Sequence, residues 1–168
     1  MHQIHPMIPL RRLSGLLVLV GLASALAIAT ATPRATAGPP CAARYTIKNG
    51  VVLDNDTKLN WQQDLNPTKL TLANASSYCD SLTLDGHDDF RVPTIFELQT
   101  ISDESRTSPV IDTATFPMTP GDIFWSQTPK IDQTDCAGCN WYVNFGLTNY
   151  ELVDAKPVTE FHYVRCVR

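Results

Sequence analysis

The sequence predicts an α+β domain, built from two short helices and an antiparallel sheet. Three observations lead to this fold class. Asn49-Gly50 lies between two β-prone runs, two stretches in the first half of the chain carry helical patterns, and short β-prone segments follow Pro109. Helices that cluster in one part of a chain and strands that cluster in another are typical of α+β domains.

A β-hairpin is the first element that we expect. Residues 44–48 and 51–53 are β-prone and flank Asn49-Gly50. Asn-Gly is the strongest short hairpin signal, because both turn positions need a positive φ. Residues 59–63 predict a third short strand.

The first helix is expected from a cap at Thr71 to about Leu82. Its apolar residues fall at helical spacing and form one stripe. The stripe consists of Leu72, Ala75, Cys79 and Leu82. Cys79 is therefore expected to point into the core.

A second helix is predicted to follow Pro93. Thr94 and Glu97 have the spacing of a capping box, in which each side chain binds the backbone N–H of the other residue. We expect the buried side of this helix to be formed by Ile95, Leu98 and Ile101. Short strands are predicted later in the chain at residues 123–126, 141–145 and 161–168. Both ends of the domain are strand-like and are candidates to pair in one sheet.

The N-terminal segment has the layout of a secretory signal peptide. Arg11 and Arg12 precede an apolar stretch, and Ala-Thr-Ala triplets end at Ala31 and Ala37. We predict a signal peptide over residues 1–37, a short linker over 38–43 and a domain over 44–168. The protein is then secreted, periplasmic or bound in the cell envelope, and its mature part contains no membrane span.

The mature chain is acidic. The leader contains three arginines and no acids, which leaves 10 basic against 17 acidic residues, a net charge of −7. Nucleic-acid binding needs clustered lysine and arginine, so this function class is excluded. The sequence also lacks Gly-x-Ser-x-Gly, His-Glu-x-x-His and phosphate-loop motifs, so we expect no catalytic residues.

Export makes disulfides the default state of the cysteines. Two bridges among five cysteines can be arranged in many ways, and the sequence leaves the connectivity open. A bridge from Cys79 to Cys166 would join the middle of the domain to its end, and Cys136 and Cys139 are close enough to form a local staple. A redox-active C-x-x-C is the alternative for this pair. Cys41 pairs with another chain, stays free or displaces one of these partners.

A series of short motifs in order resembles the Lcl C-terminal domain family of bacterial exported proteins. The resemblance runs from about Arg44 to the end of the chain. Its motifs are centred on Trp61, on Arg91, Pro93, Thr94 and Glu97, on Trp125, on Trp141 and on Arg165. It implies a C-type lectin-like fold, shared with the formylglycine-generating enzymes, in which two helices pack on a small twisted antiparallel sheet. It also implies the Cys79–Cys166 disulfide.

Several residues have both a functional and a structural interpretation. Glu97 is expected to cap the second helix and Arg91 to anchor the loop before it, rather than to catalyse a reaction. Five aspartates offer oxygen ligands for Ca²⁺, but no EF-hand spacing is present and solvated turns are the favoured interpretation. These aspartates are Asp54, Asp56, Asp85, Asp88 and Asp89. His87 and His162 are interpreted as surface or packed side chains, and most of the tryptophans are assigned to the core. We therefore expect neither a metal nor another cofactor.

The sequence thus predicts an exported, non-catalytic binding or adhesion module for a surface glycan or a cell-surface protein. Lectin-like folds usually bind ligands through loops above the sheet, which points to Asn144, Asn149, Tyr150 and Glu151. A structural envelope domain that acts through protein contacts at Cys41 is the alternative. A thiol-redox or oxidase enzyme that uses Cys136 and Cys139 is the minor alternative function.

Overall fold

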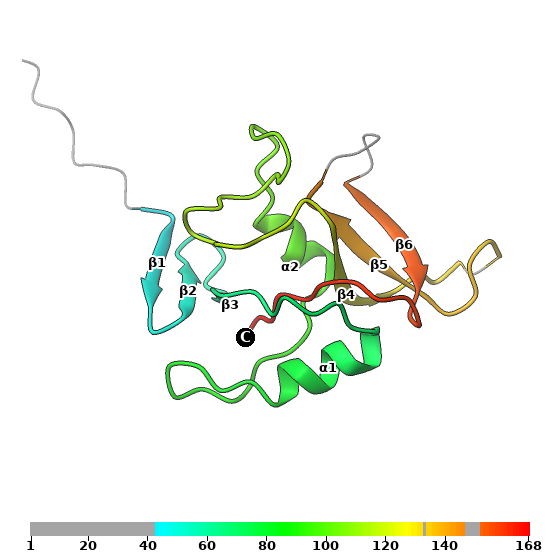
Figure 1. The fold of residues 1–168 in the computed structure, drawn as a ribbon, viewed down its shortest axis with the longest axis horizontal. Helices are drawn as coiled ribbons and strands as arrows, with labels where there is room; N and C mark the ends of the chain where they lie inside the picture. Colours follow the sequence, from blue (N-terminus) through cyan, green and yellow to red (C-terminus); the bar gives the residue numbers. More distant parts are fainter. Residues whose placement is uncertain (1–42, 133, 147–151) are drawn as a thin grey trace, which may run out of the picture. The chain divides into compact units, whose positions relative to one another are not determined.

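The computed structural model describes residues 43–132, 134–146 and 152–168 (Figure 1). These residues form two small antiparallel sheets of three strands each. The elements are β1 (Tyr45–Lys48), β2 (Val51–Asp54), β3 (Asn60–Gln62), α1 (Leu72–Asp80), α2 (Ile95–Thr100), β4 (Ile123–Pro129), β5 (Cys139–Asn144) and β6 (Val153–Pro157). Within these ranges, no helix has the length and apolar character needed to cross a membrane.

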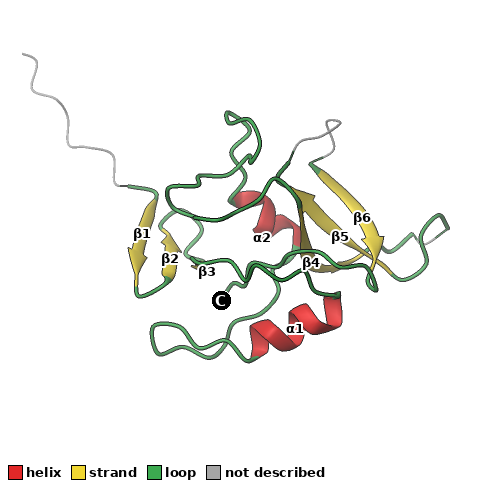
Figure 2. Ribbon diagram, viewed as in Figure 1, coloured by secondary structure: helices red, strands yellow, loops and turns green. Residues whose placement is uncertain are grey.

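The predicted fold class is wrong. The described part of the chain is mostly β-structure and loop, with strands in two separate sheets rather than in one (Figure 2). α1 has nine residues and α2 has only six. Two helices packed on one twisted sheet, the C-type lectin-like arrangement that the resemblance implied, are therefore not what the chain forms. The helical patterns are real, but they extend over too few residues to build a helical layer.

The N-terminal hairpin forms as predicted. β1 and β2 pair with Lys48 opposite Val51, and the turn residues Asn49 and Gly50 have φ values of 48° and 79°. β3 adds to β2 with Trp61 opposite Val52, which confirms the third strand.

Both predicted helix caps are present. The Thr71 side chain accepts a hydrogen bond from the backbone N–H of Asn74 at the start of α1. Thr94 and Glu97 form the complete capping box of α2. α2 ends early, where the Thr100 hydroxyl turns back and donates to the carbonyl of Glu97 at 2.6 Å. Side chains that bind the preceding turn in this way favour helix ends.

The C-terminal segment, residues 161–168, forms backbone hydrogen bonds with strands of both sheets. The sequence predicts a short strand over residues 161–168, but this segment pairs through isolated bridges with several elements. Tyr163 exchanges backbone hydrogen bonds with Ile123 and Trp125 of β4, and Arg168 exchanges two with Asn60 of β3. Figure 1 shows this last segment running between β3 and β4. The end of the chain therefore pairs with the third strand of the first sheet.

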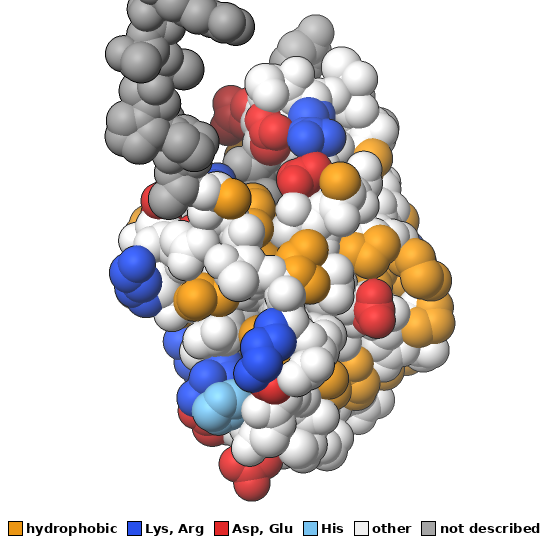
Figure 3. All heavy atoms as spheres, turned by 90° about the vertical axis from the view of Figure 1, so that its left-hand side faces the viewer, with side chains coloured by type: hydrophobic (Ala, Val, Ile, Leu, Met, Phe, Trp, Pro, Cys, Tyr) orange, Lys and Arg blue, Asp and Glu red, His pale blue; other side chains and the backbone are white. Residues whose placement is uncertain are grey.

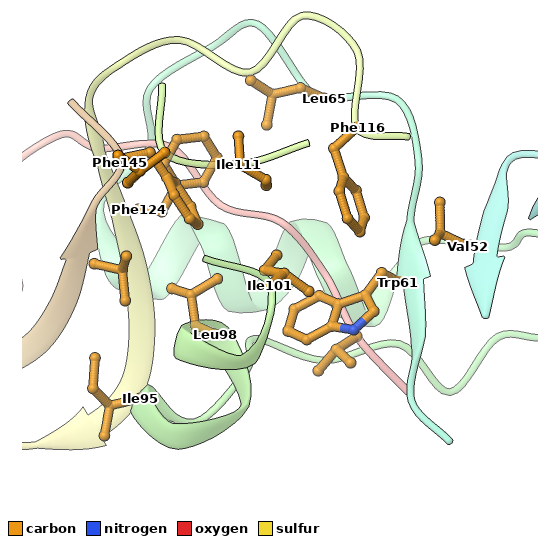
Figure 4. Packing of buried hydrophobic residues seen from close by; sticks show 13 residues of the cluster. Val52, Trp61, Leu65, Ile95, Leu98, Ile101, Ile111, Phe116, Phe124 and Phe145 are labelled. Atoms are coloured by element: carbon orange, nitrogen blue, oxygen red, sulfur yellow. The ribbon is translucent and has the colours of Figure 1, made fainter. Parts of the chain in front are cut away.

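One hydrophobic core is shared by α2, both sheets and the loops between them (Figure 4). Trp61 from β3, Leu98 from α2 and Phe124 from β4 are all fully buried in it. The predicted buried side of α2 is confirmed, since Ile95, Leu98 and Ile101 are at most 6% exposed. A second cluster contains Cys79 and lies under α1.

Candidate functional site

An open groove lies beside α2 and the second sheet. We call it the α2–β5 groove, and its volume is about 520 Å³. It is lined by Ile95, Phe96 and Gln99 of α2, by Thr128 to Asp132 at the end of β4 and beyond it, by Trp141 of β5 and by Val153 of β6. Most of these side chains are apolar, which is the usual composition of a ligand pocket.

Two large apolar side chains at this groove are highly exposed. Phe96 is 77% exposed and Ile131 is 94% exposed. Trp141, which also lines the groove, is partly buried and packs against the main core. A single exposed apolar residue is ordinary, but exposed apolar side chains grouped around a concave surface mark an interaction site.

Backbone contacts fix the two walls of the groove. The backbone N–H of Ile95 donates to the hydroxyl of Thr128 at 3.0 Å, and that of Gln127 donates to the carbonyl of Pro93 at 2.8 Å. These bonds attach the start of α2 to β4. The β4–β5 register shifts between Trp125 and Pro129, and an irregularity of this kind re-aims the residues that follow it.

A bidentate ion pair holds α2 in place. The two terminal nitrogens of Arg91 donate to the two carboxylate oxygens of Glu97 at 2.6 and 2.8 Å. Glu97 also accepts from the backbone N–H of Thr94 at 2.8 Å. The hydrogen bonds from Arg91, assisted by those from Thr94, lower the pKa of Glu97 to about 2. Both residues thus have the anchoring and capping roles expected from the sequence.

The polar edge of the groove contains one ammonium group held by carboxylates. Lys130 Nζ lies 2.8 Å from both carboxylate oxygens of Asp135 and 5.9 Å from the ring centroid of Trp141. The hydrogen bond to Asp135, together with the charges of Asp154 and Asp132, raises the pKa of Lys130. Lys130 therefore stays charged and is already neutralised by its neighbours.

A second groove of about 490 Å³ lies at the start of α1. Its walls include Thr71, Ser76, Gln127 and Thr159, and every side chain that lines it is uncharged. Large exposed apolar side chains such as Phe96 and Ile131 are not among its lining residues. For this reason we rank it below the α2–β5 groove.

Of the predicted ligand residues, the structure describes Asn144. Asn144 ends β5, and its side-chain oxygen accepts from the backbone N–H of Gly146 at 2.8 Å. It is half-buried and stabilises a turn, and it does not line the α2–β5 groove. Asn149, Tyr150 and Glu151 lie outside the described residues.

The residues of the family motifs are mainly structural. Trp61 and Trp125 are fully buried, and Trp125 Nε1 donates to the carbonyl of Leu70 at 2.8 Å. Arg165 is also fully buried and donates to the carbonyls of Gln62 and Gln63. Trp141 differs from the other tryptophans, because it borders the groove.

Three of the five candidate calcium ligands have hydrogen-bond partners among the side chains of the protein. Asp54 accepts a hydrogen bond from Arg44 at 2.9 Å, and Asp85 accepts from Lys48 and Asn49. Asp89 pairs with Arg168. Among the described residues, no three His, Cys, Asp or Glu side chains are grouped as a metal site. His162 is buried against Trp125, and this burial lowers its pKa, whereas His87 is exposed.

The structure contains both disulfides. Cys79–Cys166 ties α1 to the C-terminal segment with a Cα–Cα distance of 5.5 Å, which confirms the pairing implied by the resemblance. Cys136–Cys139 closes the β4–β5 loop with a Cα–Cα distance of 5.7 Å, which confirms the local staple. Cys41 and the predicted signal peptide lie outside the described residues.

Most described basic side chains are already paired with acids. The ion pairs include Arg44–Asp54, Lys48–Asp85, Lys69–Asp122, Arg91–Glu97, Arg106–Asp103, Lys130–Asp135 and Arg168–Asp89. On the face that carries β1, Lys and Arg side chains accordingly lie beside Asp and Glu side chains (Figure 3). Such a mixed surface offers little to a polyanion.

Sequence reasoning missed Phe96 and Ile131 as site residues. A signal was present for Phe96, which directly follows Ile95 and therefore falls off the apolar stripe of α2. An aromatic residue off the buried stripe of a helix is exposed, and an exposed aromatic is a candidate contact. Ile131 lies in a polar loop, and nothing in the sequence placed it beside α2.

The sequence matches the model of one protein family. The model of the Lcl C-terminal domain matches residues 50–168. No curated protein matches the chain. Because the match covers well over half of the sequence, the chain belongs to the Lcl C-terminal domain family.

Proposed function

We propose that this protein is an exported, non-catalytic binding module that holds its ligand in the α2–β5 groove. The signal-peptide layout of residues 1–37 supports export. The exposed Phe96 and Ile131 beside a partly buried Trp141 are the observation that carries the proposal. These side chains remain in water at an energetic cost that a bound ligand would remove.

The ionisable groups near the groove support a non-catalytic role. Glu97 is held ionised by Arg91 and the cap of α2, so it is a poor proton donor near neutral pH. Lys130 is held charged by Asp135, so it is a poor nucleophile and a poor base. Cys136 and Cys139 are joined to each other and serve as a loop staple in this account.

Two arrays test this function: a glycan array and a random-peptide array, both probed with the purified protein. The decisive variants are Phe96→Ser and the matched control Phe161→Ser. Phe161 is 61% exposed and does not line the groove. Both replacements are at exposed positions and should change folding stability by less than about 0.5 kcal/mol.

We expect probes that bind the wild type to be lost with Phe96→Ser and kept with Phe161→Ser. If both variants keep the same bound probes, the ligand is not held in the α2–β5 groove. The absence of any bound glycan or peptide would count against a binding function altogether.

A further inference from the structure

The charges around the α2–β5 groove indicate what kind of partner it accepts, and this inference rests on the proposed function. Among the described residues that line the groove, Lys130 is the only cation, and Asp132 lines the groove as well. The carboxylates that act on Lys130 are those of Asp135, Asp154 and Asp132. The carboxylates that act on Lys130 thus outnumber it three to one, and only Asp135 pairs with it directly. The predicted mature chain as a whole has a net charge of −7.

Lys130 is not available to an anionic ligand. Its ammonium group lies 2.8 Å from both oxygens of Asp135. A sulfate, phosphate or carboxylate would have to break that pair and would then meet Asp132. Like charges brought together at an interface select against a partner.

Asp132, in contrast, is available to a cation. Its side chain is exposed, and its Oδ1 accepts hydrogen bonds from the backbone and hydroxyl of Thr134, a neighbour without charge. A cation beside an apolar side chain would match both parts of the site, because the apolar part would cover Phe96 and Ile131 while the charge meets Asp132.

We infer that the α2–β5 groove accepts a cationic amphipathic peptide segment. This is a stretch of a partner protein that carries lysine or arginine next to large apolar side chains. The apolar wall supplies the contact area, and the acidic edge selects the sign of the charge.

Isothermal titration calorimetry of the full mature protein with three hexapeptides tests this inference. The peptides alternate leucine with lysine, with serine or with glutamate. We expect the lysine peptide to bind about fivefold tighter than the serine peptide, and the glutamate peptide to bind most weakly. The preference should largely vanish between about 50 mM and about 500 mM sodium chloride, because salt screens exposed charges.

Paired variants locate the effect. Asp132→Asn should weaken the lysine peptide about threefold and leave the serine peptide unchanged. Asp80→Asn makes the same change of net charge at an exposed position at the end of α1 and should have no effect. Phe96→Ser should weaken the lysine and serine peptides alike, while Phe161→Ser should weaken neither.

Equal binding of the lysine and serine peptides, or equal effects of Asp132→Asn and Asp80→Asn, would overturn the inference. A neutral glycan that needs Phe96 when the lysine peptide does not bind would overturn it while leaving the proposed function in place. A dimer that is seen by analytical ultracentrifugation and lost with Phe96→Ser would overturn both, since a second copy of this chain would then occupy the groove. If no probe depends on Phe96, both proposals fail.

Discussion

Arg165 is buried as a charge without an ion pair among the described residues. Its guanidinium donates to the carbonyls of Gln62 and Gln63 and to the hydroxyl of Thr119, and its Nε has no partner there. Burial lowers its pKa to about 9, so it is still protonated at neutral pH. Phe116 lies under the guanidinium, with 5.0 Å between Cζ and the ring centroid. Arg165 thus fastens the C-terminal segment to the end of β3.

We predict that Arg165→Ala lowers the free energy of unfolding by about 3–5 kcal/mol, because it leaves a cavity and removes three hydrogen bonds, two of them fully buried. Urea unfolding followed by tryptophan fluorescence measures this loss. Lys156→Ala, at a half-buried position of β6, should cost less than about 0.5 kcal/mol. A loss below about 1 kcal/mol for Arg165→Ala would show that the segment is held by other contacts.

The ionised Glu97 side chain should make the free energy of unfolding depend on pH in the acid range. Its folded pKa is about 2, below the ordinary value of 4.5, because Arg91 and Thr94 bind the ionised form. A lowered pKa adds stability above the ordinary pKa, and this stability is lost as the pH falls from about 4.5 to about 2. We expect the stability advantage of the wild type over Glu97→Gln to shrink across this range, as measured by urea unfolding at several pH values.

A matched control separates this effect from general acid unfolding. Glutamine can still accept the capping hydrogen bond, so Glu97→Gln removes mainly the charge. Glu104→Gln changes an exposed glutamate in the loop after α2, and its difference from the wild type should stay constant with pH. A constant difference for Glu97→Gln as well would contradict the ion pair with Arg91.

At the scale of elements, the two disulfides should differ in strength. Cys79–Cys166 spans 87 residues and joins α1 to the C-terminal segment, whereas Cys136–Cys139 spans three. The chain-entropy model assigns about 4–5 kcal/mol to the first bridge and about 2 kcal/mol to the second. Urea unfolding of the two double Cys→Ala variants should show this order, and equal losses would contradict it.

Local signals predicted the hairpin and both helix starts well. Asn49-Gly50 and the Thr94–Glu97 pair act through neighbouring backbone groups, so the sequence alone contains what they need. The same reasoning found Cys79 on the buried face of α1. These are interactions between residues a few positions apart.

Features that depend on distant contacts were not predictable in this way. β6 has one β-branched residue, Val153, and ends in a proline, so its strand character comes from pairing with β5. The split into two sheets depends on the route of the C-terminal segment between β3 and β4. The groove depends on α2 meeting the end of β4, which no local pattern encodes.

At the scale of the whole molecule, the C-terminal segment explains why two small sheets form one domain. A three-stranded sheet of short strands is marginal alone. Here Tyr163 pairs with β4, Val167 pairs with Arg91, and Arg168 pairs with β3, so the two sheets share one backbone seam. The common core of Trp61, Leu98 and Phe124 lies beside it.

Calcium should change neither the thermal stability nor the ligand binding of the protein. Three of the aspartates that are candidate calcium ligands form ion pairs within the protein. These pairs are Asp54 with Arg44, Asp85 with Lys48 and Asp89 with Arg168. We therefore expect the melting temperature to be unchanged, within about 1 °C, between calcium and chelator, and we expect the array profile to be the same in both. A calcium-dependent rise in melting temperature would require a metal site that this account lacks.

The location of the bound ligand tests the central claim most directly. The strongest probe from the arrays is titrated into ¹⁵N-labelled protein, and backbone amide shifts are followed by NMR. We predict that the largest shifts fall on Phe96, Gln99, Ile131, Trp141 and Val153, which line the α2–β5 groove. Largest shifts on Thr71, Ser76 and Thr159, in the groove beside α1, would contradict it.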